Sequence, residues 1–350
     1  MKAATHTHYG PPTVFCLQEV ARPRVGDGQV LIQVHACPVT QGDRRLRSAD
    51  FPGIGMIMGR LMFGIFRPRH SIPGTMFAGR VVAIGAGVTR FAVGDDIFGA
   101  CDHGAYAEYM VVQEDSAIAR IPEGFEYDQA AAIPYGAGCA LVFLRDIAKV
   151  ERGQRVLIIG AAGGVGRFAV QIARHLGAEV TGVCSGSDAE MVKKLGATAV
   201  FDYRQQDFTK NGQTYDVIFD TAAGDRFRAC RGSLSEKGRY VTVYLNGGVL
   251  LQMLMTSLLG GRKVASAVVM GAQELTEEVA KLMEQGVIWP VIAAEFALDE
   301  IIAAHELFEN GEPKGAVVVR VSDLKRSAPH GSEHEVKNGE ETWPMRAVSG

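Results

Sequence analysis

The pattern of apolar and polar positions changes character near residue 125. From Met1 to about Pro122, short β-branched runs are punctuated by glycine and proline, as in residues 30–36 (VLIQVHA) and 79–85 (GRVVAIG). Runs of this kind are typical of short strands separated by turns. The first part of the chain is therefore expected to form a barrel-like β domain.

Beyond residue 125, unbroken apolar runs alternate with segments of helical spacing. Residues 155–159 (RVLII) read as a buried strand, and apolar residues follow at helical spacing at Val165, Ala169, Ile172, Ala173 and Leu176. Further strands are expected at residues 179–184, 199–203, 216–220 and 239–243. A helix is expected from about Asp188, with Ser187 and Glu190 forming a capping box at its start. Repeated βα alternation predicts a doubly wound parallel sheet.

The end of the chain is expected to rejoin the first domain. After about Val287 the pattern is β-like again, and residues 315–321 (GAVVVRV) read as a last strand. We therefore predict an α/β protein with one domain over residues 1–124, completed by 287–321, and a second over 125–286. Residues 322–350 are polar and lack apolar periodicity, which predicts a disordered tail.

The strongest chemical signal is the glycine-rich turn after the strand at 155–159. Ala161, Gly163 and Gly166 follow the dinucleotide fingerprint, with Ala in the first place, and Gly164 and Val165 lie between them. Glycine is needed there because a pyrophosphate must reach the backbone N–H groups at a helix N-terminus. A strand precedes this turn and a helix follows it, which favours a dinucleotide site over a plain tight turn.

The next strand end indicates which dinucleotide is bound. An NAD site places a carboxylate there for the ribose 2′-OH, but here the strand ends in Cys184 and Ser185, followed by Ser187. Ser185 could donate a hydrogen bond to a 2′-phosphate, and Arg204 would add positive charge, so NADPH is expected, with NADH as the alternative. The other interpretation is that these serines only shape a turn and cap a helix.

Composition narrows the class of partner. The 350 residues are 47% apolar and 21% charged with a net charge of −3, which gives no basic footprint for nucleic acid. Six scattered cysteines without a C-x-x-C pair argue against a disulfide framework and indicate a reducing compartment. The N-terminus has no secretory apolar core, and neither apolar stretch reaches membrane-spanning length. A cytoplasmic protein is expected.

Several segments, in this order and at this spacing, resemble the medium-chain dehydrogenase/reductase superfamily. They are residues 29–36 (QVLIQVHA), 73–81 (PGTMFAGRV), 93–99 (VGDDIFG), 104–109 (GAYAEY), 130–134 (AAAIP), 161–166 (AAGGVG) and 194–197 (KLGA). The resemblance runs from Met1 to Val321. It implies a GroES-like β-barrel domain, a Rossmann domain, a cofactor bound in the cleft between them, and a homo-oligomer.

The resemblance also places the chain in the zinc-independent, quinone oxidoreductase-like branch. The positions of the family's catalytic zinc ligands match Thr40, Thr75 with Met76, and approximately Tyr135. Hydroxyl groups are poor zinc ligands beside thiolate and imidazole, so no metal is expected. Cys37 and His35 lie nearby and are interpreted as packing residues of a strand.

Two departures from the family bear on the site. Where relatives usually have Asn-x-x-Asp beside the nicotinamide, this chain has Thr40 and Asp43, so the Asn is replaced. Where some relatives have Lys after the second Rossmann strand, this chain has Asp188, which would weaken a preference for NADPH. Cys184, Ser185 and Tyr203 match NADPH-binding relatives, and NADPH is retained as the prediction.

The reaction expected is metal-free hydride transfer to an electrophilic acceptor, a quinone or an activated enone or carbonyl. The hydroxyls of Tyr135 and Thr40 are candidates for stabilising the developing anion, with Asp43 relaying a proton. The alternatives are that Tyr135 only packs and that Asp43 only pairs with the nearby arginines. At the level of the whole protein, the alternatives are a dinucleotide-binding sensor or structural protein and, less favoured, a zinc alcohol dehydrogenase.

Two apolar stretches, residues 54–66 and 249–259, are expected to line or cover the cleft and to favour a bulky apolar substrate among small electrophilic molecules. Their flexible side chains would include Met56, Met58, Met62, Met253 and Met255. Because Arg60, Arg67 and Arg69 flank the first stretch, the alternative is a contact with a membrane surface or with another subunit.

Overall fold

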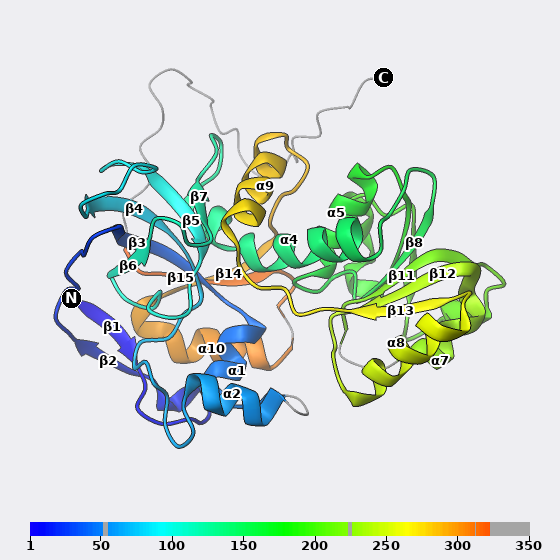
Figure 1. Ribbon diagram of the computed structural model, residues 1–350, viewed down its shortest axis with the longest axis horizontal. Coiled ribbons are helices and arrows are strands. Elements are labelled where there is room, and N and C mark those ends of the chain that lie inside the picture. Colours follow the sequence, from blue (N-terminus) through cyan, green and yellow to red (C-terminus); the bar gives the residue numbers. More distant parts are fainter. Residues whose placement is uncertain (52–54, 223–225, 312, 323–350) are drawn as a thin grey trace.

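The protein consists of two parts joined side by side. The structure, a computed structural model, describes residues 1–51, 55–222, 226–311 and 313–322, with residues 55–58 described by their backbone. Figure 1 shows the β-rich part on the left, built from the N-terminal and C-terminal segments, and a parallel sheet with its helices on the right. The expected α/β fold class is therefore confirmed.

The β-rich part is built on a seven-stranded sheet. Its strand order is β14-β15-β3-β4-β5-β7, and β6 also pairs with β3. The strands are β3 (Gln29–Val39), β4 (Met76–Ile84), β5 (Asp96–Ala100), β6 (Tyr109–Gln113), β7 (Ile118–Arg120), β14 (Ile292–Ala297) and β15 (Ala316–Arg320). A separate antiparallel pair is formed by β1 (Lys2–Thr5) and β2 (Cys16–Glu19). Because β15 pairs with β3, the C-terminal segment completes this sheet.

The second part contains a six-stranded, fully parallel sheet. Its strands are β8 (Arg155–Ile159), β9 (Glu179–Cys184), β10 (Ala199–Asp202), β11 (Tyr215–Asp220), β12 (Leu234–Thr242) and β13 (Lys263–Ser266). The order β10-β9-β8-β11-β12-β13 is that of a doubly wound dinucleotide-binding fold. The chain reverses its direction of growth between β8 and β11, and in such sheets ligands bind at this switch point.

Ten helices lie in the described ranges. They are α1 (Gln41–Ser48), α2 (Gly55–Phe63), α3 (Tyr127–Ala131), α4 (Pro134–Leu141), α5 (Gly166–His175), α6 (Ala189–Lys194), α7 (Phe227–Cys230), α8 (Gly247–Leu259), α9 (Gln273–Glu284) and α10 (Ile301–Glu309). The apolar spacing predicted for α5 is confirmed, since Ala169, Ile172 and Ala173 are fully buried.

One apolar core runs through both parts and fixes the walls of the cleft between them. Ala36 and Ala78 from the first sheet belong to the same buried cluster as Val156 and Ile158 of β8. The α3 and α4 segments supply the residues between them, among them Ile133 and Ala137. On this basis we propose the division into residues 1–124 with 287–321 and residues 125–286.

The capping prediction for Ser187 was wrong. Residues 186–188 form a short 3-10 turn, α6 begins at Ala189, and neither start has a side-chain cap. The Ser187 hydroxyl instead bonds that of Ser185 at 2.8 Å, because the turn intervenes between the strand and the helix. The predicted tail lies, apart from Ser322, outside the described residues.

Candidate functional site

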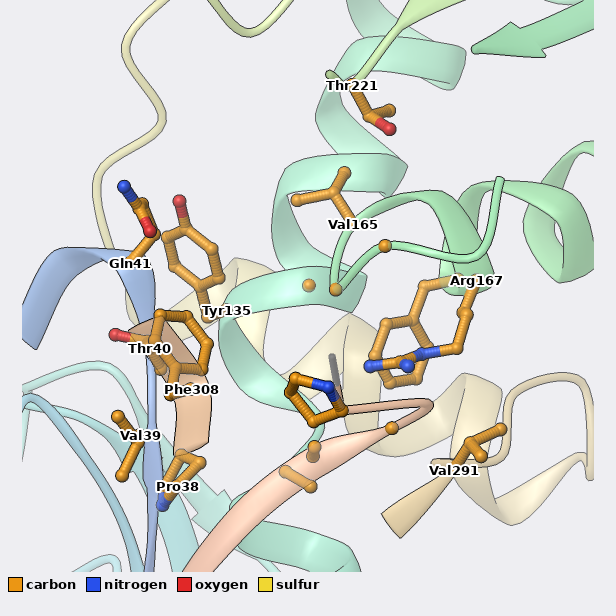
Figure 2. Close-up of a pocket in the computed structure, with 18 of the residues that line it drawn as sticks. Pro38, Val39, Thr40, Gln41, Tyr135, Val165, Arg167, Thr221, Val291 and Phe308 are labelled. Carbon is orange, nitrogen blue, oxygen red and sulfur yellow. The ribbon is translucent and has the colours of Figure 1, made fainter. Parts of the chain in front are cut away.

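A cavity of about 460 Å³ lies between the two parts at the switch point of the parallel sheet. Pro38, Val39, Thr40 and Gln41 form one wall, at the end of β3 and the start of α1. The glycine loop and Arg167 form the facing wall, and Thr221, directly after β11, closes one side. Figure 2 shows these residues converging on one space, with Phe308 and Val291 contributed by the C-terminal segments.

Two glycines of the glycine loop differ in the space around them. A Cβ at Gly166 would lie 2.0 Å from the carbonyl oxygen of Gly160, so this position is closed by contact between α5 and the end of β8. A Cβ at Gly164 would meet no atom within 4 Å, and Gly164 lines the cavity. Packing explains the first glycine, whereas open space beside a helix N-terminus suits an approaching pyrophosphate at the second.

The other residues of the predicted fingerprint likewise either line the cavity or are buried beneath the loop. Gly163 and Val165 line the cavity, together with Ala162. Ala161 is fully buried, and it lies beneath the loop against Gly182 of β9. The part of the fingerprint that faces the cavity is therefore residues 162–165.

Arg167, in the first turn of α5, is a residue that the sequence reasoning missed. Only 5% of it is exposed, it lines the cavity, and its side chain makes no hydrogen bond or ion pair with a described residue. Burial lowers the pKa of its guanidinium to about 10, and the charge of Asp188 only partly opposes this effect. A buried cation without a partner is unfavourable unless a ligand completes it. The available signal was an arginine directly after the last glycine of the fingerprint, in the first turn of the helix.

Asp43 and Thr40 form a closed hydrogen-bonded unit behind the opposite wall. The Asp43 carboxylate accepts bonds from the N–H and Oγ1 of Thr40, at 2.9 and 2.5 Å, and from the N–H and Oγ1 of Thr75, at 3.0 and 2.8 Å. Asp43 is 1% exposed, and burial raises the pKa of its carboxyl group against the effect of these bonds. Thr40 in turn caps α1, where its Oγ1 accepts from the Asp43 N–H.

The alternative interpretation of Asp43 as a salt-bridge partner was wrong. Within the described ranges its carboxylate forms no ion pair, because it points toward Thr40 and Thr75 rather than along the helix surface. Arg44 pairs with Asp50, and Arg47 pairs with Glu309. Asp43 is also set back from the cavity, which it reaches only through Thr40.

Tyr135 lies on the cavity wall near the start of α4, where Pro134 occupies the first helical position. It is 39% exposed, and its hydroxyl makes no hydrogen bond with a described residue. Desolvation by the surrounding protein is the largest cause of its raised pKa. The phenol therefore stays protonated at neutral pH and can donate a hydrogen bond into the cavity. In Figure 2 its hydroxyl end lies near Gln41.

The residues predicted to bind the adenosine end gather at the ends of β9 and β10, outside the lining of the cavity. The Tyr203 N–H donates to the Cys184 carbonyl at 3.2 Å, which brings the two strand ends together. Arg204 lies over the Tyr203 ring, 5.7 Å from its centroid. The Ser185 hydroxyl donates to Asp188 at 2.5 Å, and the second carboxylate oxygen of Asp188 is buried without a partner.

The described side chains of the two apolar stretches do not line this cavity, so for them the expectation that they form its wall was wrong. Neither residues 59–66 nor residues 249–259 are among its lining residues. Ile54 and the side chains of Met56 and Met58 lie outside the described part, and Met62 and Met255 are exposed. Met253, in α8, is partly buried against the apolar core of the second part. The two stretches form helices on the surface instead.

The residues at the positions of the family's zinc ligands form hydrogen bonds or line the cavity in this structure. Thr40 and Thr75 both bond to Asp43, and Tyr135 is the free phenol of the cavity. Nowhere in the described ranges do three His, Cys, Asp or Glu side chains gather as metal ligands would. Cys37 is buried and donates to the Ala105 carbonyl, and His35 stacks on Tyr127 with 4.1 Å between ring centroids. Both are packing residues of β3, as predicted.

Comparisons with known proteins agree with this architecture. Residues 26–123 match the family model described as alcohol dehydrogenase GroES-like domain, and residues 195–319 match the one described as zinc-binding dehydrogenase. A quinone oxidoreductase from Sus scrofa is 33% identical over 321 residues, covering 87% of this chain and 93% of that protein. A 2-methylene-furan-3-one reductase from Solanum lycopersicum is 28% identical, covering 91% and 79%.

A solved structure extends the likeness to three dimensions. The quinone oxidoreductase from Coxiella burnetii superimposes with a TM-score of 0.80 at 29% identity, covering 92% of this chain and 99% of that one. The predicted GroES-like and Rossmann domains are thereby confirmed. The chain belongs to the medium-chain dehydrogenase/reductase superfamily, in its quinone oxidoreductase-like branch.

Proposed function

We propose that this chain, an NAD(P)H-dependent oxidoreductase, transfers hydride from NADPH to a quinone or an activated enone without a metal. The observation that carries the proposal is the facing pair of walls in one cavity. One wall offers an open glycine loop and an unpartnered Arg167, and the other offers the free phenol of Tyr135. The first suits a dinucleotide, and the second suits an acceptor that gains negative charge on oxygen.

The residues fit a dinucleotide on physical grounds. The space over Gly164 is one that a Cβ would fill, and the backbone N–H groups of residues 163–165 lie at the start of α5. Arg167 would bind the pyrophosphate and neutralise its charge. When bound, the cofactor supplies the hydride, and the protein fixes the geometry of the transfer.

NADPH is proposed over NADH because of the residues at the ends of β9 and β10. Arg204 has no acidic partner for its guanidinium among the described residues, and Tyr203 is exposed beside it. Together they offer a cation and an aromatic face for a phosphorylated ribose and its adenine. Asp188 opposes this choice, but its carboxylate already accepts a hydrogen bond from the Ser185 hydroxyl, which is also bonded to the Ser187 hydroxyl.

On the substrate side, the roles of the three candidate residues differ. Tyr135 donates to the carbonyl oxygen of a quinone or enone and stabilises the anion that develops there. Thr40 donates its own proton to Asp43, so its oxygen can only accept a hydrogen bond from the cavity side. Asp43 therefore acts as a positioning residue that orients Thr40, and proton delivery falls to Tyr135 or to solvent.

The relatives with reductase names do not favour the alternative of a binding protein with little catalysis. The zinc alcohol dehydrogenase alternative would require Thr40, Thr75 or Met76, and Tyr135 to act as ligands, and hydroxyl groups serve zinc poorly. A small apolar electrophile remains the proposed substrate class.

Two properties of the whole protein are also proposed. The exposed side chains of Val268 and Met270, next to the edge strand β13, favour a homo-oligomer. All six cysteines are free, which favours a reducing compartment such as the cytoplasm.

The proposal is tested by oxidation of NADPH and NADH by the purified protein, after metal analysis, with a panel of quinones and α,β-unsaturated carbonyls. We expect zinc-free turnover that prefers NADPH. Tight binding of NADPH without turnover on any acceptor would overturn the assignment as a reductase, and turnover that depends on stoichiometric zinc would overturn the metal-free mechanism.

A further inference from the structure

Helix α8 is rich in apolar residues, yet nine of its thirteen residues are exposed. Its thirteen residues contain no charged side chain, and Val249 is its one buried residue. Leu258 and Leu259 are 77% and 78% exposed, and Leu250, Leu251, Leu254 and Met255 are also exposed. These six exposed apolar side chains lie on one helix without charged residues, and a continuous exposed apolar surface of this kind indicates a partner.

Positive charge gathers at the C-terminal end of this helix. A second cavity, of about 400 Å³, lies between α7, the start of β12 and the last turn of α8. Arg228, Arg231 and Arg262 line it together with Met255 and Leu259, and Glu236 is its one acidic lining residue. The guanidinium groups of Arg228 and Arg231 have no partner among the described residues, while Arg262 donates to the Leu234 carbonyl at 3.0 Å. The cavity therefore joins an apolar wall to a net positive charge.

Exposed apolar side chains also lie beside arginines on the other domain, in α2 and the residues that follow it. Leu61, Met62 and Phe66, in α2 and directly after it, are exposed, and Phe66 is 91% exposed. Arg67 lies among them, and Arg60 and Arg69 bond to carbonyls of the same segment. Figure 1 shows α2 and α8 along the same lower edge of the molecule, one on each domain.

We propose that α8, with the arginines beside its C-terminal end, docks this protein on the surface of a membrane that contains anionic phospholipids. The leucines enter the boundary between headgroups and acyl chains, and the arginines bind lipid phosphates, which is how an interfacial helix is held. α2 provides a second contact on the same edge. The inference does not rest on the proposed function, because docking and turnover are measured separately.

Docking on the surface is the form of membrane contact that the geometry allows. Thirteen helical residues extend about 20 Å, less than the roughly 30 Å of a bilayer's hydrocarbon core. No helix in the described ranges combines the length and apolar character needed to cross a membrane. A second copy of this chain fits less well, because α8 carries no acid to offer the arginines of its partner.

The test is flotation of the full chain with vesicles of phosphatidylcholine alone and with vesicles that also contain phosphatidylglycerol. We expect flotation with the anionic vesicles and little with the neutral ones. The double variant Arg228→Gln/Arg231→Gln should weaken partitioning about 25-fold, since each basic residue near an anionic surface contributes about fivefold. Leu254→Ser/Leu258→Ser should weaken it by more than about tenfold.

Matched control variants test whether the loss of positive charge or of an exposed apolar side chain elsewhere on the protein also weakens binding to vesicles. Lys193→Gln/Lys194→Gln removes the same charge from exposed positions on α6, at the opposite edge of the parallel sheet. Val93→Ser removes an exposed apolar side chain from the other domain. Both should leave flotation within about twofold of the unchanged chain, because neither touches α8. All these positions are exposed, and a thermal melt confirms that each variant is folded.

Three results would overturn the proposal. The first is no flotation of the unchanged chain with anionic vesicles. The second is equal weakening by the arginine pair and the lysine pair. The third, followed by light scattering, is a leucine variant that dissociates an oligomer while flotation is unaffected, which would assign α8 to a second copy of the chain.

Discussion

The two walls of the interdomain cavity differ in whether the protein itself forms hydrogen bonds with their buried polar groups. On the first-domain wall, the Asp43 carboxylate accepts four hydrogen bonds, and the Thr40 hydroxyl both donates and accepts. On the Rossmann wall, Arg167 is equally buried but makes no hydrogen bond or ion pair with the described residues, and Gly164 faces open space. The polar groups of the first wall are satisfied by the protein itself, whereas the buried guanidinium of the second wall is paired with no described residue.

This difference distinguishes polar groups that stabilise the fold from polar groups that bind a ligand. A buried charge that the protein itself satisfies fixes local geometry, and removing its partners destabilises the fold. A buried charge that the protein leaves unsatisfied is unfavourable until a ligand arrives, so its removal should reduce binding and spare stability. Substitutions on the two walls should therefore separate effects on stability from effects on cofactor binding.

The first prediction compares two glycines of one loop. Gly166→Val should lower the free energy of unfolding by about 3 kcal/mol or more, because its Cβ would overlap the Gly160 carbonyl. Gly164→Val should leave unfolding unchanged and weaken NADPH binding about 100-fold, the equivalent of one or two lost bonds to a charged group. Thermal melts and cofactor titrations measure both, and equal effects of the two variants on stability would contradict the division.

Arg167→Met should weaken the binding of NADPH about 30-fold, since a bond to a charged group contributes roughly 2 kcal/mol. The same change should leave the free energy of unfolding unchanged or raise it, because an uncompensated buried cation is removed. Calorimetric titration and a chemical melt give the two quantities. Arg167→Lys, which keeps the charge, should retain part of the affinity. A destabilised variant with normal affinity would make Arg167 structural.

Asp43→Asn should have the opposite effect to Arg167→Met, lowering stability while leaving NADPH affinity unchanged. The amide has one acceptor oxygen for the four donors that the carboxylate now serves, so buried N–H groups of Thr40 and Thr75 compete for it. We expect a loss of about 2 kcal/mol in the free energy of unfolding, with NADPH affinity within about twofold of the unchanged chain. Thr75→Ser, which keeps the hydroxyl, serves as the control. An unchanged melt would show that this network contributes nothing to the fold.

Tyr135→Phe should lower kcat about tenfold on a quinone or enone, the effect of losing one hydrogen bond to the developing anion. Binding of NADPH and the melting temperature should stay the same, because the hydroxyl makes no bond within the described protein. The variant is compared with the unchanged chain at saturating cofactor. Identical turnover would remove Tyr135 from the mechanism.

The smallest expected effect is on the choice of cofactor. Arg204→Gln should raise the KM for NADPH about fivefold, as expected for one exposed charge contact, and leave the KM for NADH unchanged. Steady-state rates with the two cofactors decide this. A parallel rise in both values would mean that Arg204 does not contact the 2′-phosphate, and Asp188→Asn would then be the next change to test.

The sequence by itself determined most elements of this protein and the place of its glycine-rich loop. The period of apolar positions and the glycine fingerprint are local properties, so residues 155–176 predict a strand, a turn and a helix that the structure contains. The order of family motifs then fixed the two domains. Ser187 was misplaced because a 3-10 turn and a helix start share the same small polar residues.

Tertiary structure alone decided which polar and apolar groups are satisfied. Asp43 and Thr75 are 32 residues apart and meet only because β3 and β4 bring α1 against the next strand. Arg167 makes no hydrogen bond or ion pair with a described residue because its helix faces the cavity between domains. Helix α8 is exposed because no element of the described chain covers its outer face. Partners distant in sequence leave no periodic signal in the chain, so the satisfaction of a charge or an apolar face becomes visible only once the domains have packed.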